Sequence, residues 1–235
     1  MTNKDVIWRK WVYQGMTLAL SGFIVLTTAA MLMYRGGNEF DETAVSYVFT
    51  QNFFSDLGMS VSYLGEPKLL VMILFMIALG SVGLALIGYS AASPYFFRQT
   101  AVSHWLAWFG SLFGILSGLS YIGVAFTPSN LYLPLHKLFV LMAFVGFLIT
   151  AVFYTIAILF TKSYPNRYAY AYSAFAAALF FYVWFILYGP SFASPEGAEL
   201  QVIGQKLIVY TSIFSMMIQT YGAQQQLKIE SGDAF

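Results

Sequence analysis

The chain has 235 residues, of which 59% are hydrophobic and 9% are charged, whereas soluble domains carry roughly 25% charged residues. Eleven Lys and Arg against ten Asp and Glu give a net charge of +1, which excludes the strongly basic surface that nucleic-acid binding requires. The lack of cysteine excludes disulfides, thiolate metal sites and cysteine nucleophiles. The composition therefore predicts an integral membrane protein with one domain over 1–235 and no nucleic-acid partner.

Six apolar runs are long enough to cross a bilayer, which takes about 20 residues in a helix. The runs do not alternate as the strands of a membrane barrel do. The predicted fold is an all-α integral membrane protein, a bundle of six transmembrane helices. The predicted spans are 11–34, 69–91, 104–126, 137–160, 168–189 and 201–222.

The distribution of charge predicts an orientation, because Lys and Arg are enriched in cytoplasmic segments. Basic residues flank the spans on one side at Lys4, Arg9, Lys10, Arg98, Lys162, Arg167 and Lys228. Seven of the ten acidic residues fall on the other side, at Glu39, Asp41, Glu42, Asp56, Glu66, Glu196 and Glu199. We therefore expect both termini in the cytoplasm, the long 35–68 loop outside, and the protein in the cell (inner) membrane. The first apolar run is too long for a signal peptide, so we expect it to remain as a span.

Glycines recur at every fourth position of the third span, at Gly110, Gly114 and Gly118. A stripe of small residues lets another helix approach closely. Packing within the bundle is the favoured interpretation of this stripe, and a homodimer face is the alternative.

The middle of the predicted spans carries Ser and Thr but no Asp, Glu, Arg or His. Ion-coupled transporters usually place ionisable groups at this depth, so a proton- or sodium-driven carrier is disfavoured. Polar residues gather instead at the external ends of three spans. The candidate ligand-binding residues are Asn52, Ser55, Asp56, His136, Lys137, Glu199, Gln201 and Lys206.

Spacing predicts contacts within this set. Asn52 and Asp56 are four residues apart and share a face if NFFSDLG forms a helical turn. Lys206 lies inside the last span, where a lysine either reaches outward or pairs with a carboxylate, here that of Asp56 or Glu199. A purely structural interpretation has equal weight for the set as a whole: Asp56 would cap a helix, and His136 would anchor a span at the interface.

The sequence predicts no particular catalytic centre. A zinc hydrolase needs about three nitrogen or carboxylate ligands, but the two histidines, His104 and His136, are expected on opposite sides of the bilayer. Ser55, Asp56 and His136 have the residue types of a serine hydrolase, yet no G-x-S-x-G elbow accompanies them. No metal or other cofactor is expected, and the sequence leaves open whether any catalysis takes place.

Three segments, NFFSDLG, GVAFTPSNLYLPLHKLF and GAELQVIGQKLIVY, resemble the six-span membrane family catalogued as domain of unknown function 998, which is similar to the Frag/DRAM/Sfk group. The matching positions are Asn52, Ser55, Asp56, Leu57, Gly58, Gly123, Phe126, Pro128, His136, Gly197 and Gln201. The chain departs from the pattern near the start of the last span, where an arginine is expected and Gln201, Gln205 and Lys206 stand instead. The resemblance implies membrane lipids as the ligand class and names no reaction.

The sequence therefore predicts an external polar pocket that binds the headgroup of a membrane lipid or similar amphiphile, with processing of that ligand left open. In this prediction Lys206 and His136 face an anionic group, while Asn52 and Asp56 position them. The alternative is a non-catalytic accessory or assembly subunit that packs against other membrane proteins. A membrane carrier is the weaker third hypothesis.

Overall fold

The computed structural model describes residues 3–191 and 194–232, and α-helices dominate them. The α-helices are α1 (Asn3–Met33), α2 (Leu69–Ala92), α3 (Ala101–Phe126), α4 (Ser129–Leu159), α5 (Asn166–Tyr188) and α6 (Pro195–Ser231). Two short 3-10 helices, η1 (Phe54–Gly58) and η2 (Ser93–Phe96), lie in the connections before and after α2. All six α-helices in this part of the chain are long and apolar enough to cross a membrane. The predicted all-helical fold with six such helices is confirmed.

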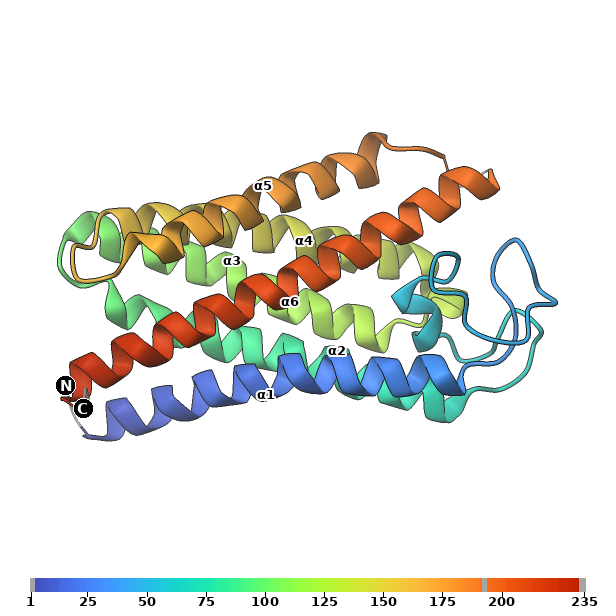
Figure 1. Cartoon of the computed structure of the whole chain (residues 1–235), viewed down its shortest axis with the longest axis horizontal. Helices are drawn as coiled ribbons and strands as arrows, with labels where there is room; N and C mark the ends of the chain where they lie inside the picture. The colour runs from blue at the N-terminus through green and yellow to red at the C-terminus, as the bar shows by residue number, and fades with distance from the viewer. Residues whose placement is uncertain (1–2, 192–193, 233–235) are drawn as a thin grey trace.

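The helices form a closed bundle in which each packs against the next along the chain and α6 packs against α1. Figure 1 shows α6 crossing the bundle on a diagonal, with both termini at one end. The long connection between α1 and α2 folds over the opposite end. We call these the terminal end and the loop end.

Helix α6 extends well beyond the predicted span 201–222. Its first turn is capped by the Ser194 side chain, which accepts a hydrogen bond from the Gly197 N–H, and it ends at Gly232 with φ of 80°. Hydropathy detects only the apolar part of a helix, so the polar turns at both ends were missed. Lys206 therefore lies about three turns inside α6, deeper than predicted.

Helix α4 also begins earlier than predicted, at Ser129, and is bent near its start. Tyr132 has non-helical angles (φ −131°, ψ 44°), two residues before Pro134. Proline lacks an N–H and clashes with the preceding turn, which explains the break. The regular part of α4 starts beside His136, close to the predicted start of the span.

The glycine stripe of α3 packs inside the bundle, as the favoured interpretation predicted. A Cβ atom added at Gly118 would lie 2.6 Å from the main-chain oxygen of Gly83 on α2, and one at Gly110 would lie 3.1 Å from Tyr154 on α4. The main chains of α2 and α3 thus approach each other at a distance that only glycine allows.

The terminal end is closed by a contact between the first and last helices. The buried Arg9 of α1 forms an ion pair with Glu230 of α6 at 3.0 Å. Its guanidinium also lies 4.1 Å from the centre of the Phe96 ring. Because a cation over an aromatic face is stabilised by the ring, this contact joins α1, η2 and α6.

Candidate functional site

The loop between α1 and α2 folds back onto the bundle through its own polar groups. Tyr34 donates its hydroxyl hydrogen to the main-chain oxygen of Gly37 at 3.0 Å, and Asn52 Nδ2 donates to the same oxygen at 3.0 Å. Gly37 has φ of 75°, a left-handed conformation that favours glycine. The turn at Gly37 therefore fixes Asn52, and with it the start of η1, beside the end of α1.

Asp56 occupies the centre of this folded loop and is only 4% exposed. Its Oδ2 accepts hydrogen bonds from Asn52 Nδ2 at 3.1 Å and from the Phe53 N–H at 3.0 Å. The predicted contact between Asn52 and Asp56 is confirmed. The hydrogen bond from Phe53 also shows that Asp56 caps the first turn of η1, as the structural interpretation predicted.

Burial raises the pKa of Asp56 to about 6. The hydrogen bonds from Asn52 and Phe53, and the positive charges of Lys206 and Lys68, act in the opposite direction. These groups keep the carboxylate ionised at neutral pH even though it has little contact with water.

Lys206 reaches this loop from α6 and is 3% exposed. Its Nζ donates to the main-chain oxygen of Asn52 at 2.5 Å and to the Tyr47 hydroxyl at 2.6 Å. The ammonium also lies 4.4 Å from the centre of the Phe54 ring and 5.2 Å from that of Phe49. Hydrogen bonds and aromatic faces thus surround the charge in place of water.

Lys68, the residue just before α2, supplies a second buried ammonium and was not among the predicted site residues. Its Nζ donates to the main-chain oxygens of Asp56 and Leu57 and lies 5.0 Å from the centre of the Tyr34 ring. Burial lowers the pKa of Lys68 to about 8, and the Asp56 carboxylate limits this decrease. Its position as a rare basic residue on the acidic side of the sequence was the signal that could have identified it.

The predicted ion pair of Lys206 is not formed among the described residues. Lys206 Nζ binds the main-chain oxygen of Asn52, while the Asp56 carboxylate faces the Asn52 amide, so Asn52 lies between the two charges. Glu199 is half-buried near the start of α6, two turns before Lys206. Asp56 therefore acts on Lys206 through space. Glu199 lies outside the connected set Tyr47, Asn52, Asp56, Lys68 and Lys206, which we call the loop-end network.

Two glutamines of α6 have separate structural roles. Gln205 Oε1 accepts a hydrogen bond from the Phe54 N–H at 2.8 Å and so attaches η1 to α6. Gln201 Nε2 donates to the main-chain oxygens of Pro190 and Phe185, at 3.1 and 3.3 Å. The predicted residue Gln201 thus hydrogen-bonds main-chain oxygens at the end of α5, whereas Gln205 hydrogen-bonds η1.

The remaining predicted residues also lie at the loop end but outside the network. His136 is buried, and its Nδ1 lies 2.7 Å from the main-chain oxygen of Thr127, across the turn between α3 and α4. Lys137 is exposed on α4, and Ser55 is half-buried in η1. The predicted role of His136 beside Lys206 is therefore not seen, because its ring is held by the α3–α4 turn.

An apolar cavity of about 60 Å³ lies in the bundle interior. Its lining residues are Met16, Leu20, Phe23, Leu79, Val82, Leu86, Tyr121, Phe147, Val209, Ser212, Ile213 and Met216. Phe23 lies 5.6 Å from Phe54, ring centre to ring centre. Val209 follows Lys206 by three residues and so lies on the same face of α6. The cavity and the charged network are therefore neighbours along the bundle.

The residues that the structure describes contain no group of three His, Asp or Glu side chains that could hold a metal ion. The charged groups of the loop-end network are the carboxylate of Asp56 and the ammonium groups of Lys68 and Lys206. Aromatic side chains lie beside both ammonium groups.

Comparison of the chain with protein-family models, curated proteins and solved structures finds no match. The resemblance to the family catalogued as domain of unknown function 998 therefore stays a prediction.

Proposed function

We propose that this chain is an integral protein of the cell inner membrane, with both termini in the cytoplasm, and that it binds the headgroup of an anionic lipid or similar amphiphile at the loop end. The observation that carries the proposal is the charge of the loop-end network. It buries two lysines, Lys68 and Lys206, and one carboxylate, that of Asp56.

The number of buried charges matters because burying a charge costs free energy. Removing an ammonium from water costs several kcal/mol unless an opposite charge or strong hydrogen bonds replace the water. Asp56 can neutralise one of the two lysines, and main-chain oxygens and aromatic rings supply the other contacts of Lys68 and Lys206. With both lysines protonated, the network carries one positive charge in excess, which an anionic headgroup would neutralise.

The surroundings of Lys206 fit an amphiphile better than a small anion. The Phe49 ring beside its Nζ is 46% exposed, so the ammonium is one side chain from the surface. Phe54, which also lies beside the ammonium, contacts Phe23 of the apolar cavity. A ligand that displaces Phe49 would meet a cation first and apolar side chains beyond it.

Native mass spectrometry of the purified protein tests this proposal directly. The protein in mild detergent is titrated with short-chain phosphatidylglycerol, which is anionic, and with short-chain phosphatidylcholine, which is zwitterionic. Lys206→Met removes the buried charge while keeping an unbranched side chain. Lys137→Met removes a charge at the same end from an exposed position and is the matched control.

Wild-type protein and Lys137→Met are expected to prefer phosphatidylglycerol, and Lys206→Met is expected to lose about tenfold in affinity, the effect of one charge-assisted hydrogen bond. Circular dichroism and gel filtration establish that the variants are folded. Equal binding of the two lipids by the wild-type protein, or unchanged binding by folded Lys206→Met, would exclude the proposal.

An accessory or assembly subunit is a second candidate function, favoured by a groove of about 520 Å³ on the outer face of α1 and α2. Gly15 and Gly22 border this groove, and a Cβ atom at either would meet nothing within 4 Å. Small residues at an open face allow a helix of another membrane protein to approach. Gly15→Leu would then abolish stoichiometric co-purification of a partner, whereas Ala177→Leu, on the exposed face of α5, would not. Purification of the wild-type chain without any partner would count against this function.

A further inference from the structure

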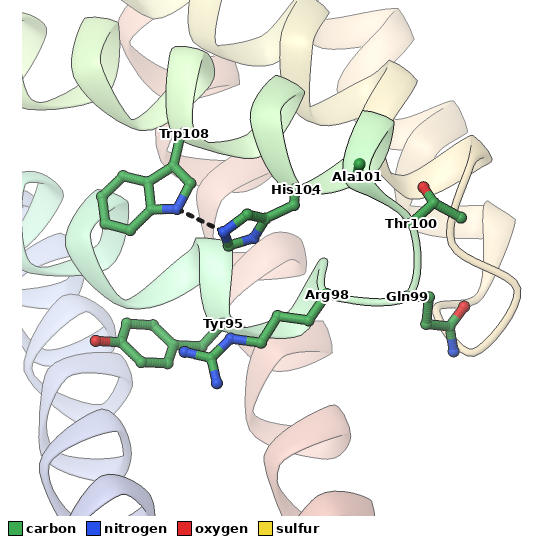
Figure 2. A pocket seen from close by; sticks show the side chains of 7 residues that line it. All are labelled: Tyr95, Arg98, Gln99, Thr100, Ala101, His104 and Trp108. Atoms are coloured by element: carbon green, nitrogen blue, oxygen red, sulfur yellow. Dashed lines mark hydrogen bonds between the residues drawn. The ribbon is translucent and has the colours of Figure 1, made fainter.

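A hollow at the terminal end has the composition of an anion site. It measures about 430 Å³ and lies where η2 leads into α3 (Figure 2). Its lining residues are Tyr95, Arg98, Gln99, Thr100, Ala101, His104 and Trp108. This volume is within the range of about 300–1,000 Å³ that small-molecule sites occupy.

Two aromatic contacts hold the basic side chains of this hollow in place. The Arg98 guanidinium lies 4.4 Å from the centre of the Tyr95 ring, and Trp108 Nε1 donates to His104 Nε2 at 3.1 Å. Figure 2 shows the Arg98 and His104 side chains bordering the same space, with Tyr95 and Trp108 beside them. Stacking on Tyr95 engages the face of the guanidinium and leaves the N–H groups at its edge available to a ligand.

His104 adds a donor without a partner. Because Nε2 accepts the hydrogen bond from Trp108, the ring proton of neutral His104 is on Nδ1. Nδ1 is buried and has no hydrogen-bond partner among the described residues. A buried donor without an acceptor costs free energy, and a turn of the His104 side chain toward an acceptor of a ligand in the hollow would remove this cost.

The charge of the hollow has one sign. Its lining contains Arg98 but no Asp or Glu, and no carboxylate of the described residues lies within ion-pairing distance of Arg98. An adjacent hollow that shares Arg98 contains Asp5 and Glu230, and there Glu230 pairs with Arg9. Of these two hollows, the one that His104 lines combines an arginine and an unsatisfied histidine donor without an acid in its wall.

We propose that this hollow binds a phosphate group through Arg98 and His104, and that the group belongs to the headgroup of an anionic lipid. Arginine matches the oxygens of a phosphate group with two parallel hydrogen bonds. Trp108, which lines the hollow, is 43% exposed, and tryptophans concentrate where headgroups lie. Free phosphate offers the same chemistry, so the test has an arm for each source. The site shares no residue with the loop-end network and goes beyond the proposed function.

The chain has two histidines, which allows a readout specific to this hollow. Protein labelled with nitrogen-15 histidine in mild detergent is titrated separately with short-chain phosphatidic acid, short-chain phosphatidylcholine and inorganic phosphate. The side-chain nitrogen resonances are followed by NMR, and His136→Asn assigns those of His104. His136 lies at the opposite end of the bundle, so its resonances serve as an internal reference that binding in this hollow leaves unchanged.

Arg98→Gln is compared with Arg167→Gln, because Arg167 is also exposed at the terminal end and its guanidinium lies over the Tyr168 ring at 5.0 Å. Phosphatidic acid is expected to shift the His104 Nδ1 resonance in wild-type and Arg167→Gln protein, and to bind Arg98→Gln about tenfold more weakly. An equal response to inorganic phosphate would support the site and identify free phosphate as its source. No shift with either anion, or the same shift in Arg98→Gln, would overturn the proposal.

Discussion

Lys206 Nζ donates a hydrogen bond of 2.5 Å to the main-chain oxygen of Asn52, which lies 154 residues earlier in the chain. This bond joins the last helix to the loop between α1 and α2 and places a buried cation next to the Asn52–Asp56 pair. The loop is thus held to the bundle by the same lysine that supplies the surplus charge of the network.

The attachment of the loop to α6 also depends on Gln205. Gln205→Leu leaves the buried Phe54 N–H without an acceptor, at a cost of about 1–3 kcal/mol. We expect faster hydrogen exchange of the amides in 52–58, measured by mass spectrometry. Gln224→Leu is the control, because Gln224 bonds the exposed Thr17 hydroxyl elsewhere on the same helix. Equal exchange in both variants would contradict a role for Gln205 in fixing η1.

Stability is expected to depend on the ionisation of Asp56. The gap between its ordinary pKa of 3.8 and about 6 in the folded protein corresponds to about 3 kcal/mol at 1.36 kcal/mol per pKa unit. A raised pKa means that the folded state binds the proton more tightly than the unfolded state. The tighter proton binding therefore adds about 3 kcal/mol to the free energy of unfolding below about pH 4, and this stabilisation is lost as the pH rises through about 6.

Thermal unfolding in detergent between pH 4 and pH 7 measures this effect. Relative to Asp56→Asn, which cannot ionise, the wild-type protein is expected to lose stability over this range and to change little above it. Parallel curves for the two proteins would show that ionisation of Asp56 in the folded state is not disfavoured.

Two glycines of membrane-spanning helices should respond differently to the same substitution. Gly118→Ala places a Cβ atom 2.6 Å from the Gly83 oxygen, so helices α2 and α3 must separate, at a cost of about 1–3 kcal/mol. Gly15→Ala meets open space, and the higher helix propensity of alanine makes it neutral or slightly stabilising. Melting temperatures of the two variants check this prediction, and equal losses would contradict the close approach of α2 and α3.

The sequence was sufficient for the helices because lipid requires long apolar segments, which composition reveals directly. It was also sufficient for the contact of Asn52 with Asp56, because their spacing within one turn brings them together whatever the rest of the chain does. It was insufficient for Lys68, whose partners are main-chain oxygens of a folded loop. Main-chain oxygens are present at every residue, so no residue type identifies them.

His136 is the converse case, a residue that the sequence predicted in the site but that lies outside the loop-end network. Its residue type and its place at the loop end fit a ligand site, but its ring lies against the main-chain oxygen of Thr127 in the turn between α3 and α4. The bend of α4 at Tyr132 sets that geometry. A pattern of residue types predicts the end of the bundle at which a side chain lies, and tertiary contacts decide its partner.

The most direct test of the central claim is the affinity of short-chain phosphatidylglycerol across a series of loop-end charges. Asp56→Asn removes the one carboxylate and Lys206→Met removes one of the two ammonium groups, so the surplus charge rises in the first variant and falls in the second. Native mass spectrometry is expected to rank binding as Asp56→Asn tightest, wild type next and Lys206→Met weakest. Equal affinity for the three folded proteins, or the reverse order, would contradict an anion site in the loop-end network.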